Sequence, residues 1–160
     1  MRLAFAFFLL SVAASANAWA ASAPAEQPKQ FTPQEIVWGP GPEALPPGAQ
    51  KAVLYGDPSK PGQFAIRLKF PKGYRVPPHT HPVPEIVTVI SGTFKLGMGP
   101  VADESKAKAF PPGSFVAVEP GMAHFAFFDE DTVIQTNTTG PWAVNYVNPK
   151  DDPRLNKKTP

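Results

Sequence analysis

The sequence predicts an all-β fold, an antiparallel sandwich or barrel, and two features of the chain point to it. Apolar and polar residues alternate over 63–70, as in a strand with one buried face, and one side of it carries Phe64, Ile66, Leu68 and Phe70. Turn signals rich in Gly, Pro and Asp separate such runs about every 8–12 residues, the spacing typical of sandwiches and barrels. No stretch shows a helical repeat long enough to compete with this pattern.

The chain begins with the pattern of a secretory signal peptide. Arg2 precedes an apolar run over 3–14, and small residues offer cleavage after Ala18 or Ala20. The apolar run is shorter than the ~20 residues that a membrane span needs. We therefore expect a signal peptide over 1–20 and a periplasmic or secreted protein with no membrane span after cleavage.

The rest of the chain has the length of one domain. Residues 21–34 are rich in Pro, Ala and Gln and are expected to form a flexible linker, followed by a barrel over 35–150 and a C-terminal tail over 151–160. The 15 basic and 13 acidic residues are scattered, which excludes the clustered basic face that nucleic acid requires. The sequence has no cysteine, so disulfides and thiolate chemistry are excluded as well.

Three strands are expected before the histidines. The first is 35–38, where an Ile-Val-Trp run precedes the Gly-Pro turn signal at 39–42. The second, 52–55, ends at the turn 56–59, and the alternating strand 63–70 follows.

The later strands follow the same logic. Residues 85–91 are typical of a regular strand that ends at a Ser-Gly turn, and 92–98 of the return strand. Residues 101–108 are charged and are expected to form a surface loop. Turn signals at 119–121 and 129–131 separate the remaining expected strands, 114–118, 124–128, 132–136 and 142–147.

All three histidines fall in two short segments, and this concentration is the main indication of function in the sequence. His79 and His81 are two residues apart, so in an extended chain their side chains point to the same face. Glu85 keeps the same parity, and His124 offers a third nitrogen further along the chain. Imidazoles and a carboxylate on one face are the ligands of a transition metal, which predicts a metal site of these four residues.

Four prolines surround the first two histidines, at Pro77, Pro78, Pro82 and Pro84. Proline lacks the N–H donor of a sheet ladder and fixes φ. We therefore expect this segment to be a stiff edge or loop and not a central strand.

These residues also carry a family resemblance. The spacing Gly73-x5-His79-x-His81-x3-Glu85-x6-Gly92 resembles the first motif of the cupin superfamily at every position. The second cupin motif, G-x5-P-x-G-x2-H-x3-N, is less closely followed. Six residues separate Gly113 from Pro120, Pro120 abuts Gly121, and Phe128 stands in the place of the Asn, whereas the spacing from Gly121 to His124 is kept.

The resemblance implies a single-domain cupin (monocupin), a double-stranded β-helix or jelly-roll-like barrel, over about residues 50–147. It implies a divalent transition metal, one of Fe, Mn, Zn, Ni or Cu, held by the four residues above. It also implies a homodimer in which the N-terminal strand around Trp38 pairs with a partner subunit; the alternative is that Trp38 caps its own barrel. The C-terminal sequence around Trp142 resembles that of small exported bacterial cupins, some related to the cupin lobe of zinc-binding anti-sigma factors.

Residues that could act beside the metal are few. Tyr74 lies in the strand that enters the metal motif, and resemblance to cupin lyases that use a tyrosinate base makes it the catalytic candidate; alternatively, its ring packs at the barrel mouth. Parity with the ligands predicts a pocket wall suited to a small, partly hydrophobic substrate such as a phenolic, a keto acid or a short organic acid. The expected wall residues, any of which could instead be plain core, are Phe64, Ile66, Val87, Phe94, Met98, Met122, Ala126 and Phe128.

Two functions are compatible with these features. The first is a metal-dependent enzyme acting on a small organic molecule, either an oxygenase or a lyase, isomerase or decarboxylase. The second is a non-catalytic module that binds or senses a metal or ligand. An enzyme requires a polar group near a bound substrate, whereas a binding module does not.

Overall fold

The computed structural model describes residues 27–155 of the chain as two facing antiparallel sheets, consistent with the all-β prediction. The expected signal peptide and the first part of the linker lie outside the described residues. In the described part, no helix is both long and apolar enough to cross a membrane.

The larger sheet has six strands in the order β1-β2-β3-β10-β5-β8. β10 is central, with its whole length paired to β3 and its first half to β5. The bounds of these strands are β1 Gly39–Pro40, β2 Gln50–Tyr55, β3 Gly62–Phe70, β5 Glu85–Ser91, β8 Phe115–Val118 and β10 Thr132–Gly140.

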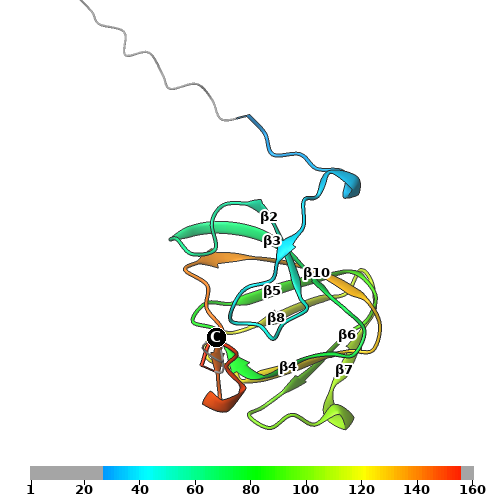
Figure 1. Ribbon diagram of the computed structural model, residues 1–160, viewed down its shortest axis with the longest axis vertical. Coiled ribbons are helices and arrows are strands. Elements are labelled where there is room, and N and C mark those ends of the chain that lie inside the picture. The colour runs from blue at the N-terminus through cyan, green and yellow to red at the C-terminus, as the bar shows by residue number, and fades with distance from the viewer. Residues whose placement is uncertain (1–26, 156–160) are drawn as a thin grey trace, which may run out of the picture.

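The smaller sheet has five strands in the order β11-β4-β9-β6-β7. In Figure 1, β4, β6 and β7 lie in the lower part of the molecule and β2, β3 and β10 in the upper part. The bounds are β4 Tyr74–Thr80, β6 Phe94–Met98, β7 Lys108–Phe110, β9 His124–Phe128 and β11 Asn145–Tyr146.

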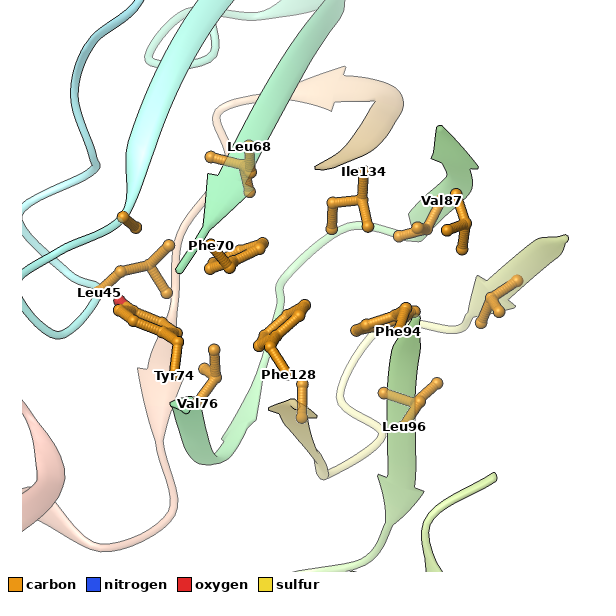
Figure 2. Packing of buried hydrophobic residues seen from close by; sticks show 14 of the residues in the cluster. Leu45, Leu68, Phe70, Tyr74, Val76, Val87, Phe94, Leu96, Phe128 and Ile134 are labelled. Atoms are coloured by element: carbon orange, nitrogen blue, oxygen red, sulfur yellow. The ribbon is translucent and has the colours of Figure 1, made fainter. Parts of the chain in front are cut away.

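The core lies between the sheets and is dominated by aromatic rings. Phe70 and Phe128 stack with their centroids 4.1 Å apart, and Phe94 stacks on the other side of Phe128 at 5.7 Å. Figure 2 shows these rings in a row between the two sheets, with aliphatic side chains on both sides. This stack is the wall against which the functional site is built.

The first half of the proline-rich segment forms a strand inside its sheet, which corrects the expectation of an edge or loop for Pro77 and Pro78, whereas Pro82 and Pro84 lie in the loop between β4 and β5, as expected. β4 lies between β11 and β9. Its ladder to β9 is regular from Tyr74 to Val76, is interrupted, and resumes at His79. Pro77 and Pro78 occupy the interruption. They lack N–H donors, but the ladder to β9 forms no hydrogen bonds at these two positions, so none is lost.

Three further expectations need correction. Residues 35–38 are not a strand: Glu35 is the last residue of the 3-10 turn Pro33–Glu35, Val37 is 85% exposed, and the pairing to β2 begins only at β1. The charged loop 101–108 contains the 3-10 turn Glu104–Lys106 and ends at the first residue of β7. Of the expected strand 142–147, only β11 is paired.

The first part of the expected tail packs on the barrel. A 3-10 turn, Pro149–Asp151, leads to Asp152, whose carboxylate accepts hydrogen bonds from the Arg154 guanidinium. Arg154 also donates to the carbonyl of Val144 at 2.9 Å. This contact holds the residues before β11 against the barrel interior.

Candidate metal centre

The four predicted ligands meet between the two sheets. His79 on β4 and His124 at the start of β9 are direct cross-strand partners in the smaller sheet. His81 directly follows β4, and Glu85 is the first residue of β5 in the facing sheet. All four side chains are buried, with His124 only 1% exposed. The fold therefore brings together the whole set that the sequence predicted.

Each imidazole is held through its Nδ1 atom by a backbone carbonyl. Nδ1 of His79 lies 2.7 Å from the oxygen of Pro77, Nδ1 of His81 lies 2.7 Å from that of Ala143, and Nδ1 of His124 lies 2.9 Å from that of Met122. A carbonyl oxygen only accepts, so Nδ1 carries the hydrogen in each ring. The lone pairs are therefore on the three Nε2 atoms, the tautomer that metal-binding histidines adopt.

The free nitrogens converge. One ligand nitrogen from each histidine lies within 4.8 Å of the others. The carboxylate of Glu85 lies beside two of them, with Oε2 3.1 Å from Nε2 of His124 and Oε1 3.7 Å from Nε2 of His81. Nε2 of His81 is buried and has no hydrogen-bond partner among the described residues. A buried polar atom without a hydrogen-bond partner lowers the stability of the fold unless a bound ligand interacts with it.

The protonation states favour a cation at this position. Burial, assisted by the neighbouring histidines, lowers the pKa of His79 to about 3, and burial also lowers the pKa of His81, so both rings stay neutral. Burial alone would raise the pKa of the Glu85 carboxyl, but the adjacent His124 and His81 outweigh it and lower the pKa. Burial opposes the charged form of His124, yet the Glu85 carboxylate raises its pKa.

The donor set fits a divalent transition metal. Two neutral imidazoles, a third that holds a displaceable proton and an ionised carboxylate provide nitrogen and oxygen donors with one negative charge. His79, His81 and His124 would hold the ion, with Glu85 as the adjacent carboxylate. The residues do not distinguish Fe, Mn, Zn, Ni and Cu.

A small cavity adjoins the four ligands, with a volume of about 30 Å³. That volume accommodates roughly two water molecules. Apart from the four candidate ligands, the described side chains that line the cavity are hydrophobic: Leu45, Leu68, Phe70, Val76, Phe94, Ala126, Phe128, Ile134, Trp142 and Val144. Phe128 occupies the position where the second cupin motif has Asn, and it makes this wall apolar.

The predicted pocket wall is correct in part. Phe94, Ala126 and Phe128 line the cavity, whereas Phe64, Ile66 and Val87 are buried in the core but do not border it. Alternation identifies which residues of a strand face the core, but not which of them lie close to the metal ligands. On β3, only the later inward residues Leu68 and Phe70 reach the level of the ligands.

The two methionines need a plain correction. Met98 and Met122 are 45% and 47% exposed and do not line the cavity at the ligands; they border a neighbouring pocket together with the core residues Leu96, Val116 and Val118. Met98 is the cross-strand partner of His124 but lies at the end of β6, where its side chain is no longer enclosed.

The structure also corrects the expectation of a catalytic role for Tyr74. Its side chain does not line the cavity, and its hydroxyl donates to the carbonyl of Pro46. Burial raises its pKa well above the ordinary value, which disfavours a tyrosinate base. Its ring packs on Phe70 with centroids 5.1 Å apart, the packing role that was the alternative.

Seven residues that line the cavity were not in the predicted wall: Leu45, Leu68, Phe70, Val76, Ile134, Trp142 and Val144. Leu45, in a loop rich in Pro and Gly, lines the cavity from the N-terminal side of the chain. Trp142 stacks on His81 with centroids 4.7 Å apart and an interplanar angle of 20°. Trp142 belongs to the expected strand 142–147. The side chains of Trp142 and Val144 do line the cavity, although residues 142–144 are not paired with another strand.

The fold and the site define a cupin. The model of a family described as the ChrR cupin-like domain (Cupin_7) matches residues 26–143, so the chain belongs to this family. No protein with a curated functional description matches the chain.

Solved structures share the fold at low sequence identity. The polyketide cyclase RemF from Streptomyces resistomycificus is 16% identical, with a TM-score of 0.61 over 84% of this chain and 95% of its own. An acetylacetone dioxygenase from Acinetobacter johnsonii is 17% identical, with a TM-score of 0.60 over 83% of this chain and 85% of its own. The Rhodobacter sphaeroides complex of SigE with the anti-sigma factor ChrR gives 20% identity and a TM-score of 0.50 over 67% of this chain and 51% of the other.

Proposed function

We propose that the protein is a metal-dependent enzyme that acts on a small organic molecule, and that oxygenase chemistry suits it better than lyase, isomerase or decarboxylase chemistry. The observation that carries the proposal is the convergence of three carbonyl-anchored imidazoles beside Glu85 in an apolar cavity. A bound metal would supply Lewis acidity or redox capacity there.

The composition of the cavity favours oxygenase chemistry. Lyases and isomerases need a positioned acid or base next to the substrate. Among the described lining residues, the titratable groups are His79, His81, Glu85 and His124, and these are the candidate metal ligands. In an oxygenase the metal itself would supply the chemistry, so a separate acid or base is not needed and the protein has to hold the ion, position the substrate and exclude water. The apolar wall around Phe128 meets these needs. The same lining, with no further titratable group among the described residues, is also what a binding module predicts.

A non-catalytic binding or sensing module is the second candidate. The cavity of about 30 Å³ is too small for most organic substrates as it stands. The family description also takes its name from ChrR, a protein whose structure was solved with a sigma factor. A module that only holds a metal would need no larger space.

Metal content and oxygen uptake decide between these functions. We expect protein purified without a tag or chelator to hold close to one equivalent of one metal, measured by plasma mass spectrometry, and the loaded protein to consume oxygen with phenolic or keto-acid substrates. Zinc with no turnover would favour the binding module. A chain that refuses every added divalent metal would overturn the enzyme and would leave only a module that binds a ligand other than a metal.

Export and self-association are part of the proposal. We infer that the N-terminal 20 residues are removed on export to the periplasm or to the outside of the cell, and that the mature protein is a homodimer. N-terminal sequencing of the exported protein should begin at Trp19 or Ala21, and light scattering should give twice the chain mass. An uncleaved N-terminus or a monomer would contradict the respective inference.

A further inference from the structure

A loop near the N-terminal end of the barrel closes one side of the metal cavity. This segment, residues 41–49, here called the strap, joins β1 to β2 and is outside both sheets. Two backbone hydrogen bonds close it on itself, from Gly41 to the carbonyl of Ala49 and from Leu45 to that of Pro42, both 2.9 Å. Its Leu45 side chain is 6% exposed and lines the cavity.

Two tyrosines hold the strap in place. Tyr74 of β4 donates its hydroxyl hydrogen to the carbonyl of Pro46, and Tyr146 of β11 donates to that of Ala44 at 2.7 Å. Tyr146 is the cross-strand partner of His79, so the anchor stands next to the metal ligands. Figure 2 shows Leu45 and Tyr74 together at one end of the core, beside Phe70.

The strap also separates the cavity from a pocket on the surface. That outer pocket has a volume of about 280 Å³ and is lined by strap residues 42–44 together with Ile66 and Trp142. Trp142 borders both spaces. Leu45 does not border the outer pocket; it faces the cavity from the same loop. The barrier between the outer pocket and the metal ligands is therefore formed by Trp142 and strap residues 42–44, with Leu45 behind them on the cavity side.

The two spaces differ in size, and this difference indicates what the barrier does. The inner cavity of about 30 Å³ holds water-sized molecules, whereas small-molecule sites usually measure ~300–1,000 Å³. An organic molecule can reach the ligands only if some lining residue withdraws. The strap can withdraw more readily than lining residues on strands, such as Leu68 on β3, because it has no ladder hydrogen bonds to a strand to break.

We propose that the strap is the gate of the metal cavity, that Leu45 determines the size of the molecule that reaches the metal, and that the hydroxyls of Tyr74 and Tyr146 are the catches that hold the gate closed. This inference rests on the proposed function for its occupant, a small organic molecule bound beside the metal. The outer pocket serves as the entry.

The test uses the full mature chain loaded with Co²⁺, whose visible spectrum reports changes in coordination. Catechol is the probe molecule, and its association rate is measured by stopped flow. We expect Leu45→Ala to raise that rate at least tenfold, and Tyr74→Phe and Tyr146→Phe to raise it roughly fivefold each, the contribution of one neutral hydrogen bond.

Matched variants control for cavity volume and for loss of a hydroxyl. Leu68→Ala removes the same atoms from another wall of the cavity, and Tyr55→Phe removes the hydroxyl of a tyrosine that is 54% exposed. Both should leave the association rate within about twofold. An unchanged rate in Leu45→Ala, or an equal rise in Leu68→Ala, would overturn the gate.

Hydrogen exchange tests the gate without any metal. In metal-free Tyr74→Phe, the amides of Gly41 and Leu45 should exchange at least roughly fivefold faster than in the unaltered chain, while those of β3 do not change. Strap amides that exchange only together with β3 would overturn the gate. If the unaltered chain takes up no Co²⁺, or catechol changes no spectrum in any variant, the proposed function fails and hydrogen exchange alone decides the gate.

Discussion

At the level of single residues, the metal centre depends on backbone carbonyls as much as on the histidines. Each carbonyl that holds an Nδ1 atom belongs to an irregular stretch: Pro77 at the ladder interruption, Met122 in the turn before β9, and Ala143 in the unpaired segment before β11. These stretches therefore fix the tautomer and direction of the rings. The prolines of the first motif contribute by placing one of these carbonyls.

His124→Ala should abolish most metal binding while the barrel still folds. The ring contributes a nitrogen to the cluster, and its removal leaves two imidazoles and Glu85. Without His124 the pKa of the Glu85 carboxyl rises, because His124 lowers it in the unaltered chain. We expect the dissociation constant for Zn²⁺ to rise at least about 100-fold in isothermal titration, with a far-ultraviolet circular dichroism spectrum like that of the unaltered chain. Full metal occupancy in this variant would show that the ligand assignment is wrong.

Metal affinity should depend on pH through His124. The Glu85 carboxylate, working against burial, raises the pKa of His124 above its ordinary 6.5, so below that raised pKa a metal must displace one proton. The dissociation constant should then rise tenfold for each unit by which pH falls, and level off above the raised pKa. His79, with a pKa of about 3, stays neutral over this range and adds nothing.

Glu85→Gln provides the control for this pH dependence. Without the carboxylate, only the hydrogen bond to the Met122 carbonyl opposes the effect of burial on His124, so the pKa of His124 falls and the pH at which metal binding levels off moves down. Zinc titrations against a competing dye between about pH 5.5 and 8 measure both curves. An affinity independent of pH in the unaltered chain would contradict the proton–metal competition.

At the level of elements, the sequence specifies strands and faces well but not how far along a strand the site extends. Strand 85–91 and its turn at Gly92, where φ is +70°, agree with the alternation pattern. The same pattern places Ile66 and Leu68 on one face, yet only Leu68 borders the cavity. That difference comes from the offset between facing sheets, which no local pattern encodes.

Two parts of the site could not be predicted from local sequence for a related reason. Leu45 lies in a segment without alternation, and Trp142 lies in an expected strand that is unpaired at that residue. The two residues are about 100 residues apart in the chain and border one cavity because the strap folds back over the barrel. The four ligands could be predicted because their spacing carries the information. The cavity around them is a product of long-range packing.

The outer face of β9 depends on a close approach to β6, and Gly97→Ala should disrupt it. The Cβ of an alanine at Gly97 would lie 2.1 Å from the ring of Phe125, which is 1% exposed and has no room to move. We expect the free energy of unfolding in urea to fall by about 1–3 kcal/mol. Gly39→Ala is the control, since its added Cβ meets nothing closer than 3.9 Å, and should change stability little. Equal effects of the two changes would contradict this account.

On the scale of the whole molecule, the metal centre connects the two sheets. His79 and His124 belong to the smaller sheet and Glu85 to the larger one. A metal bound by all three would join strands that otherwise meet through side-chain packing and the contact between Glu85 and His124. The same connection places the site at the level where Phe70 and Phe128 stack across the core.

Metal binding should therefore stabilise the entire fold. A ligand that binds only the folded chain adds about 2.7 kcal/mol at a free concentration of 100 times its dissociation constant, which corresponds to a rise in Tm of roughly 10 °C for a chain of this size. Scanning calorimetry with and without Zn²⁺ measures the shift. His79→Ala should show almost no shift, because it loses a ligand, whereas Met98→Ala, altered at an exposed position outside the cavity, should keep the full shift. Glu85→Gln should keep only part of it, because the metal would then be held by the smaller sheet and His81 without the carboxylate from the facing sheet. A full shift in His79→Ala would mean that the metal stabilises the chain from a different site.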